Sequence, residues 1–270
     1  MAKPPNKDHL TLTPHHYEQD RDWPGESCIP VEVPVSLVYK GVSHVVMMAS
    51  PGDLEDFGLG FSLSEGIIDN VEELKFIDVA EADQGLLIDM DIPDQAHTKI
   101  ANRRRYLAGR SGCGLCGVES LEEAVPELRA VTAQLSLTRE AVYKAFDDLE
   151  HRQPVKQATG AVHGAAWCDR DGHIHLVRED VGRHNALDKL IGAMAKESYD
   201  FKDGFCLITS RCSYEMVQKA VQVGMPVLAA ISAPTSLAVE MAADNNLTLL
   251  ARVRRKCFTV YTHGARIQQE

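Results

Sequence analysis

The second half of the chain alternates between strand-like and helix-like segments, and this alternation constrains the possible folds more than any other feature of the sequence. Apolar runs at 205–209, 226–231, 247–253 and 258–262 enclose amphipathic segments at 214–223 and 236–243. Helices of about ten residues between strands indicate crossover connections, which build a parallel or mixed sheet covered on both faces. Residues 138–270 are therefore predicted to form an α/β domain with a three-layer mixed sheet.

Further patterns place a hairpin and two helices in the same domain. Thr138 has the side chain of an N-cap residue and precedes a segment with one apolar face, which indicates a helix. Strand-like residues at 161–168 and 173–177 flank a turn at 169–172, and a helical pattern follows around 186–194. A hairpin that leads into a helix is thus expected at the start of the sheet.

The first half is predicted to hold a mobile arm and a smaller α+β part. Residues 1–28 are polar and show no period, which is typical of a mobile N-terminal arm. In residues 29–137, an alternating hairpin at 31–49 precedes a helix that should start with Ser50 as N-cap and stop at Gly66. Strands are expected at 71–80 and 86–92, before a loop rich in glycine and cysteine at 109–117.

Charge and hydropathy argue against two classes of protein. The chain has 39 acidic and 28 basic residues and a net charge of −11, which disfavours a nucleic-acid-binding surface over the whole protein. Local basic clusters stand out at 103–105 and 252–256. The longest apolar stretch, 223–243, contains prolines and a glutamate, so we do not expect it to span a membrane. With no secretion signal visible, we expect a cytoplasmic protein that binds neither nucleic acid nor membrane.

Cys113 and Cys116 form a Cys-x-x-Cys pair in the loop 109–117, among four glycines. The chain has seven cysteines, and in the cytoplasm they are expected to stay reduced. A thiol beside Arg110 on a glycine-rich loop can have a lowered pKa and act as a nucleophile. The pair fits a redox dithiol, a zinc site completed by Cys206 and Cys212, or a carrier thiol, and the glycines favour the carrier thiol.

The pattern of a zinc-dependent deaminase is not met. Such enzymes need His-x-Glu and a later Pro-Cys-x-x-Cys. His163 is followed by Gly164 and Ala165, and the Cys-x-x-Cys lies upstream of it. Deaminase activity is therefore disfavoured, and no zinc cofactor is expected.

The block 179–189 contains six ionisable groups at the junction between a predicted strand and a predicted helix. Open α/β sheets bind ligands at such strand ends. We expect Arg183 to bind a phosphate through a bidentate contact, and His184 and Asn185 to hydrogen-bond a polar edge of the ligand. Asp180 is expected to orient one of these donors. The alternative reading is a buried cap at Asp180 and a surface lysine at Lys189.

Two later segments add candidate ligand contacts. The segment 209–213 leads from a strand end to a helix N-terminus, which suits a phosphate, with capping by Ser213 as the alternative. The last strand follows the basic segment 252–256, and it can be either an edge strand or one wall of a ligand pocket. We expect the basic segment and this strand to form part of a pocket for a phosphate-bearing ligand.

In combination, these segments resemble the FdhD family, the formate dehydrogenase accessory sulfurtransferases. The matching pieces are the loop 109–117, the strand 159–163, the block 179–189, the segment 209–219 with Ser213-x-Glu215-Met216, and the closing segment 258–263. The first hairpin and the helix that follows it match as well, so the resemblance covers nearly everything beyond the arm. It implies a cytidine deaminase-like fold with a smaller N-terminal part.

The resemblance also implies a function and its residues. Members of this family carry sulfur from a cysteine desulfurase to the molybdenum bis(molybdopterin guanine dinucleotide) cofactor of formate dehydrogenase, and a homodimer is implied. By resemblance, Cys113 carries the persulfide and Cys116 assists it. The resemblance and the charged segments together give the expected cofactor contacts, which are Arg183, His184, Asn185, Arg211, Phe258, Thr259, Val260, Tyr261, Thr262 and His263.

Two alternatives from other functional classes stay open. The protein can be a non-enzymatic chaperone that binds the molybdopterin cofactor, or a nucleotide-binding redox protein that uses Cys113 and Cys116 as a disulfide couple. Cys212 is a thiol that the resemblance does not require, and the sequence assigns it no role.

Overall fold

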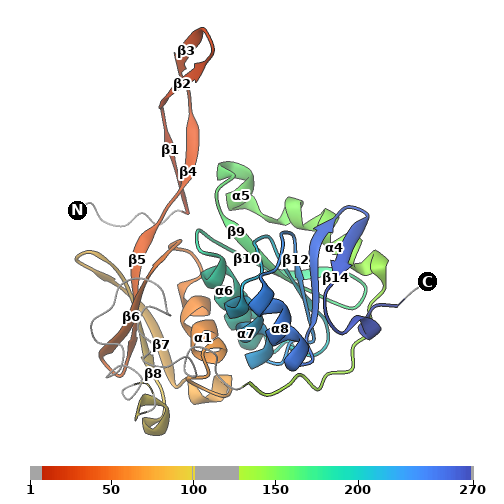
Figure 1. Cartoon of the computed structure of the whole chain (residues 1–270). Coiled ribbons are helices and arrows are strands. Elements are labelled where there is room, and N and C mark those ends of the chain that lie inside the picture. The colour runs from red at the N-terminus through yellow and green to blue at the C-terminus, as the bar shows by residue number, and fades with distance from the viewer. Residues whose placement is uncertain (1–7, 99, 101–127, 269–270) are drawn as a thin grey trace.

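Two sheets with helices between them form the body of the protein, and a thin β-ribbon projects away from it (Figure 1). The computed structural model describes residues 8–98, 100 and 128–268, and every structural statement below refers to these residues. The segment 109–117, with Cys113 and Cys116, lies outside them.

The larger sheet has six strands in the order β10-β9-β11-β12-β13-β14. Strands β11, β12 and β13 run parallel, whereas β9 is antiparallel to β10 and β11, and β14 is antiparallel to β13. The prediction of a mixed sheet is confirmed. The bounds of the strands are β9 (His163–Cys168), β10 (Ile174–Asp180), β11 (Phe205–Ile208), β12 (Val227–Ala230), β13 (Thr248–Arg254) and β14 (Cys257–Val260).

Helices cover both faces of this sheet, because its central strands carry apolar side chains on both sides. On β9, for example, Ala165 and Trp167 belong to one hydrophobic cluster, and Ala166 and Cys168 belong to another. The first cluster includes residues of α6 (Arg183–Lys196), α7 (Tyr214–Gln222) and α8 (Ser236–Asp244), and the second includes residues of α4 (Arg139–Leu149). This agrees with the predicted three-layer α/β domain. Thr138 caps α4 as predicted, because its side chain accepts a hydrogen bond from the Ala141 N–H.

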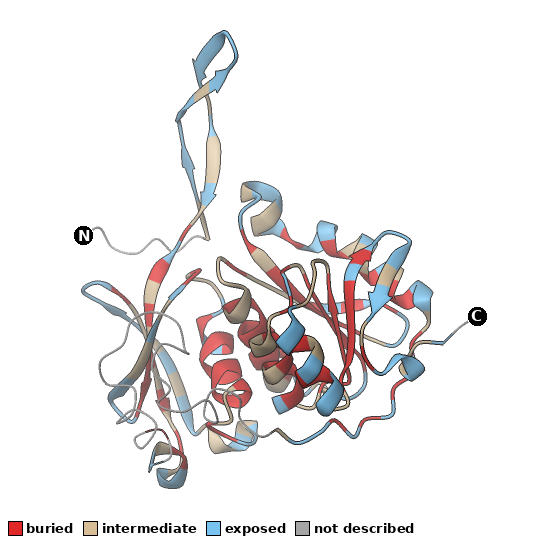
Figure 2. Ribbon diagram, viewed as in Figure 1, coloured by how far each residue is buried: buried red, intermediate tan, exposed pale blue. Residues whose placement is uncertain are grey.

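The smaller sheet has four strands in the order β6-β5-β8-β7, and α1 (Leu54–Ser64) lies between it and α6. Gly58 of α1 faces Ile77 and Ile88 of the small sheet, and Gly60 faces the α6 backbone at Asp188. Both helices are buried along most of their length (Figure 2). The strands are β5 (Val33–Tyr39), β6 (Val42–Ala49), β7 (Phe76–Ala82) and β8 (Gly85–Asp91).

The predicted start of α1 at Ser50 is wrong. The helix begins at Leu54, its N-cap Asp53 makes no side-chain capping bond, and Ser50 is buried instead. The Ser50 backbone N–H donates to Asp180 of the larger sheet, and its carbonyl accepts from Lys189 of α6. Ser50, which the local sequence pattern predicts to be a helix cap, therefore makes long-range hydrogen bonds instead. The predicted strand at 71–80 also begins late, because Val71–Glu73 forms a 3-10 helix (η1).

Residues 9–30, where the sequence analysis places a mobile arm and no strands, contain four short strands. Two short antiparallel pairs, β1 with β4 and β2 with β3, build the projecting ribbon. Most of its residues are exposed, including Tyr17 and Trp23, so its strands pair without a buried core. The strands are β1 (His9–Leu12), β2 (His15–Glu18), β3 (Arg21–Pro24) and β4 (Ser27–Pro30).

Shorter elements connect these layers. They are η2 (Glu150–Arg152), α5 (Pro154–Thr159) and η3 (Gly264–Arg266). Residues 131–137 run along the larger sheet, where Leu137 pairs with Ile267 and Leu135 joins the cluster around α4. Among the described helices, none is both long and apolar enough to cross a membrane.

Candidate functional site

Five strands of the larger sheet, β9 to β13, each have one end on the same side of the sheet. Strand β9 begins there at His163, beside the last residue of β10, Asp180, with which it pairs. Because β11, β12 and β13 run parallel to β10, their carboxyl ends reach the same edge. Loops at the carboxyl ends of strands are where open α/β sheets bind ligands. We call this side of the sheet the carboxyl edge.

The loops at the carboxyl edge are tied to one another through backbone hydrogen bonds. The Gly164 N–H donates to the Thr209 hydroxyl at 2.8 Å, and the Thr209 N–H donates to the Gly164 carbonyl at 3.0 Å. The Cys212 N–H donates to the Ala233 carbonyl at 3.2 Å. Residues 209–213, which the sequence places at a strand end, are thus held beside the loop that follows β12.

Two helices point their N-termini toward this edge, and a histidine and a glutamate join them. His184 is in the first turn of α6 and Glu215 is in the first turn of α7. The His184 Nε2 and Glu215 Oε2 atoms are 2.8 Å apart, and both side chains are about a quarter exposed, at 24% and 29%. Contact with His184 lowers the pKa of Glu215. The pair therefore brings a carboxylate and an imidazole together at two positive helix ends.

Buried hydrogen-bond donors without a partner lie in the same place. The Arg183 Nε and the Ser213 Oγ are buried, and neither is bonded to any described residue. Ser213 is the N-cap residue of α7, yet its side chain makes no capping bond, so the capping alternative is wrong. Buried polar atoms are nearly always bonded in folded proteins, and donors left over at helix N-termini suit an anionic ligand.

His163 lies at the same edge, half-buried at the start of β9. Burial lowers its pKa, and the positive charge of Arg183 lowers it further. The neutral imidazole is therefore favoured, and it can accept or donate one hydrogen bond to a ligand.

An open groove of about 450 Å³ lies farther along the carboxyl edge. Arg252 has left-handed backbone angles, with φ of 57°, within an irregularity of the pairing between β13 and β14. Such bulges re-aim side chains next to functional sites. Arg254 is held across the end of β12, where its Nη1 donates to the Ile231 carbonyl at 2.6 Å. The groove is lined by Ser232, Ala233, Arg252, Arg254, Cys257, Phe258 and Thr259.

The segment 258–263 is divided between the two edges of the sheet. Phe258 and Thr259 line the groove, and Val260 is exposed on β14. Tyr261 and Thr262 bond to β13 near its other end, where the Thr262 hydroxyl donates to the Leu247 carbonyl. His263 lies there too, beside the Ala243 carbonyl of α8. Within one chain, the expected cofactor contacts at Tyr261, Thr262 and His263 are therefore not brought to the groove.

Part of the block 179–189 is a buried structural network. Asp180 accepts from the Asn185 amide at 2.9 Å and pairs with the Lys189 ammonium at 2.7 Å. Asn185 also donates to the Met48 carbonyl, so this network ties the small sheet to α6. All three side chains are essentially buried. Direct cofactor contact by Asn185 is not supported by this burial. Asp180 is buried, but the N-cap of α6 is Gly182 and no side chain caps the helix, so the cap reading of Asp180 is wrong. Lys189 is not on the surface.

The remaining predicted residues are dispersed. Arg211 is exposed on the loop after β11. Cys206 and Cys212 are fully buried, and burial raises the pKa of Cys212 to about 12, so it is a poor nucleophile. The site gains three residues to which the sequence analysis gave no ligand role: His163, Ser213 as an unbonded donor, and Glu215. The feature that could have identified them is their position: His163 begins β9, Ser213 is the N-cap residue of α7, and Glu215 is in the first turn of α7.

Comparisons with known proteins place the chain among characterised sequences. A family model described as FdhD/NarQ family matches residues 30–268. A protein named sulfur carrier protein FdhD from Cupriavidus necator is 46% identical over 269 residues, which cover 100% of this chain and 93% of that protein. A protein of the same name from Xanthomonas oryzae pv. oryzae is 48% identical over 242 residues, which cover 90% of this chain and 86% of that protein.

A solved structure supports the fold. It comes from Desulfotalea psychrophila and is assigned as a formate dehydrogenase accessory protein. It superposes with a TM-score of 0.76 at 23% sequence identity, and the match covers 97% of this chain and 100% of that one. The mixed α/β architecture is therefore shared with a protein of distant sequence.

Proposed function

The chain belongs to the FdhD/NarQ family, and on that premise we propose that it is a sulfur carrier protein that serves a formate dehydrogenase. The observation that carries the proposal is the full-length similarity to proteins named as sulfur carriers. The loop 109–117 supplies the thiols that such a carrier needs. We also infer that the α/β part has the cytidine deaminase-like arrangement that the family resemblance implies.

The proposed transfer starts at Cys113. Its thiolate attacks the outer sulfur of a cysteine desulfurase persulfide, so that one S–S bond forms on Cys113 while the S–S bond on the desulfurase breaks. The desulfurase cysteine leaves as a thiolate, and the step needs no oxidant or reductant. Cys116 assists as a neighbouring thiol. The protein is on this proposal a sulfurtransferase with a cysteine persulfide intermediate.

The proposed acceptor is the molybdenum bis(molybdopterin guanine dinucleotide) cofactor, bound as substrate at the carboxyl edge. Its phosphates need concentrated positive charge on a protein whose net charge is −11. Arg183, Arg252 and Arg254 supply guanidinium groups there, and Arg211 extends the set on the adjoining loop. Phe258 and Thr259 give the groove one wall, and His184 and His163 offer hydrogen bonds to a base or pterin edge.

Activation of formate dehydrogenase tests this proposal. Purified enzyme that lacks sulfurated cofactor is incubated with a cysteine desulfurase, cysteine, the cofactor and this chain, and formate oxidation is measured. Cys113→Ala should abolish activation while the melting temperature and the affinity for guanosine diphosphate stay near wild type. Cys116→Ala should retain part of the activity, and Cys28→Ala, a thiol on the projecting ribbon, should activate fully.

Two outcomes would contradict the proposal. Full activation by Cys113→Ala would favour a chaperone that binds the cofactor without carrying sulfur. Equal loss in Cys113→Ala and Cys116→Ala, with no persulfide on either thiol, would favour a dithiol redox protein. A homodimer, which the family resemblance implies, and a cytoplasmic location are further parts of the proposal.

A further inference from the structure

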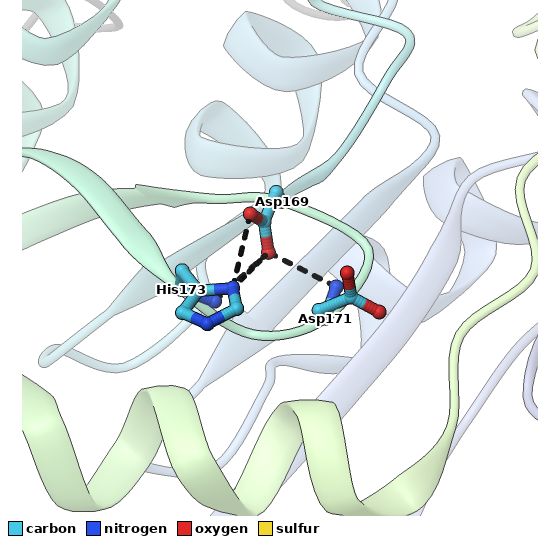
Figure 3. A group of neighbouring side chains, drawn as sticks. All are labelled: Asp169, Asp171 and His173. Atoms are coloured by element: carbon cyan, nitrogen blue, oxygen red, sulfur yellow. Dashed lines mark hydrogen bonds and ion pairs between the residues drawn. The ribbon is translucent and has the colours of Figure 1, made fainter.

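The turn that joins β9 to β10 carries a cluster of two aspartates and one histidine, Asp169, Asp171 and His173 (Figure 3), and His175 contacts this cluster through Asp169. It lies at the end of the hairpin opposite His163 and Asp180, so it is remote from the carboxyl edge. None of these residues has a part in the proposed function.

Both imidazoles converge on one carboxylate. His173 and His175 are separated by one residue along an extended chain, so their side chains share a face of the hairpin. The His173 Nδ1 is 3.2 Å from the Asp169 Oδ2, and the His175 Nε2 is 3.0 Å from the same oxygen. The Asp171 carboxylate is also close, since the ligand atoms of Asp169, Asp171 and His173 all lie within 4.8 Å of one another.

The orientation of the central carboxylate is fixed by the backbone. The Asp169 Oδ1 accepts hydrogen bonds from the N–H groups of Asp171 at 3.0 Å and His173 at 2.9 Å. The Oδ2 atom is thereby turned toward the two imidazoles. Hydrogen bonds of this kind orient metal ligands in proteins and lower the entropy that binding costs.

The two His–Asp separations are close to the distance between neighbouring ligand atoms around a bound transition metal. Bonds of about 2.0 to 2.1 Å to a tetrahedral ion place neighbouring ligand atoms about 3.3 Å apart. The two His–Asp separations are within a few tenths of an ångström of that value. Nitrogen ligands from two imidazoles favour zinc, nickel or copper over magnesium and calcium, which prefer oxygen.

We propose that Asp169, Asp171 and His173, with His175 as a fourth ligand, form a binding site for a divalent transition-metal ion such as zinc. The ion replaces the protons that the imidazoles share with Asp169, and it braces the hairpin that includes the edge strand β10. The site is structural and independent of sulfur transfer.

Zinc titration of the full chain tests the proposal. The protein is first treated with iodoacetamide so that accessible thiols do not compete, and binding of zinc ion alone is then followed by calorimetry. One zinc ion should bind per chain, and His173→Gln and His175→Gln should each weaken binding more than about tenfold. Both side chains are partly exposed, at 57% and 39%, so these variants are expected to fold.

A matched histidine and a second readout make the result decisive. His151→Gln changes an exposed histidine outside the cluster and should bind zinc like the wild type. Zinc should raise the melting temperature of the wild type and of His151→Gln, but not that of the His173→Gln/His175→Gln double variant, because only binding to the folded state stabilises it. Equal zinc affinity in all variants, or no zinc binding by the alkylated wild type, would overturn the proposal.

Discussion

Arg183 carries the buried donor at the carboxyl edge on which anion binding depends most. Its Nε has no partner among the described residues, and lysine has neither this N–H nor a bidentate fork. Arg183→Lys should therefore weaken guanosine diphosphate binding by ~1–3 kcal/mol, which is about fivefold to 150-fold, with little change in melting temperature. Calorimetric titration and thermal denaturation measure the two quantities.

Arg178→Lys is the matched control for this substitution. Arg178 donates to the Asp56 carboxylate at 2.9 Å and joins β10 to α1. Its replacement should lower the melting temperature and leave nucleotide affinity unchanged. If Arg183→Lys instead unfolds the protein while its folded fraction binds the nucleotide normally, Arg183 is a structural residue and the assignment is wrong.

Glu215 makes a pH-dependent contribution to stability. Contact with His184 lowers the pKa of Glu215 in the folded state below its ordinary value of about 4.5, so the folded state binds this proton less readily than the unfolded state. The contribution is present above about pH 4.5 and is lost as pH falls through the lowered pKa. Urea unfolding between pH 6 and pH 3 should show a shallower acid decline for Glu215→Gln than for wild type. Parallel declines in the two proteins would show that the His184 contact contributes nothing.

At the scale of elements, α1 and α6 pack so closely that glycine is required on both. A Cβ atom at Gly60 would overlap the Asp188 carbonyl of α6, and one at Gly192 would overlap the Asp56 carbonyl of α1. Alanine ordinarily stabilises a helix interior relative to glycine. Here Gly60→Ala and Gly192→Ala should each destabilise the protein by about 3 kcal/mol or more in urea unfolding, because the helices must move apart.

Gly264→Ala provides the comparison for these variants. An added Cβ there meets only the Val260 side chain at 3.3 Å, so stability should change little. Unchanged or increased stability of Gly192→Ala would show that α1 and α6 are not in backbone contact in solution.

The elements that the sequence predicts well are those whose signals are local. The apolar period and Thr138 cap predict α4, and the strand and helix alternation predicts the larger sheet. Ser50 shows where such reasoning fails, since its partners Asp180 and Lys189 are distant in sequence. The strands of the ribbon at 9–30 could not be predicted for another reason. Because the ribbon buries no apolar face, its strands show no clear alternation of apolar and polar residues.

The same distinction holds for the candidate site. Arg183 and His184 could be predicted because they lie in a charged segment at a strand end, and Phe258 because it follows the basic segment 252–256 and belongs to a stretch that resembles the family. Glu215 and His163 could not be given roles, because only the fold brings the N-termini of α6 and α7 to the start of β9. The sequence analysis treats the segment 258–263 as one set of contacts. Because β14 runs antiparallel to β13, the two ends of this segment lie at opposite ends of β13.

At the scale of the whole molecule, the helical layer between the two sheets fixes where the carboxyl edge lies. The network of Asp180, Asn185 and Lys189 anchors the start of α6 to the small sheet through Ser50 and Met48. Removing one partner of a buried ion pair costs about 3–5 kcal/mol. The first turn of α6, with Arg183 and His184, is thus held by structural residues directly beside it.

The central claim is that the chain accepts persulfide sulfur on Cys113, and mass spectrometry tests it most directly. The full chain is incubated with a cysteine desulfurase and cysteine, and the peptide that contains Cys113 is then weighed. We predict a gain of ~32 Da, the mass of one sulfur atom, that is removed by a reducing thiol and is absent in Cys113→Ala. A loss of two hydrogen atoms by linkage of Cys113 to Cys116, with no gain of sulfur, would contradict the claim.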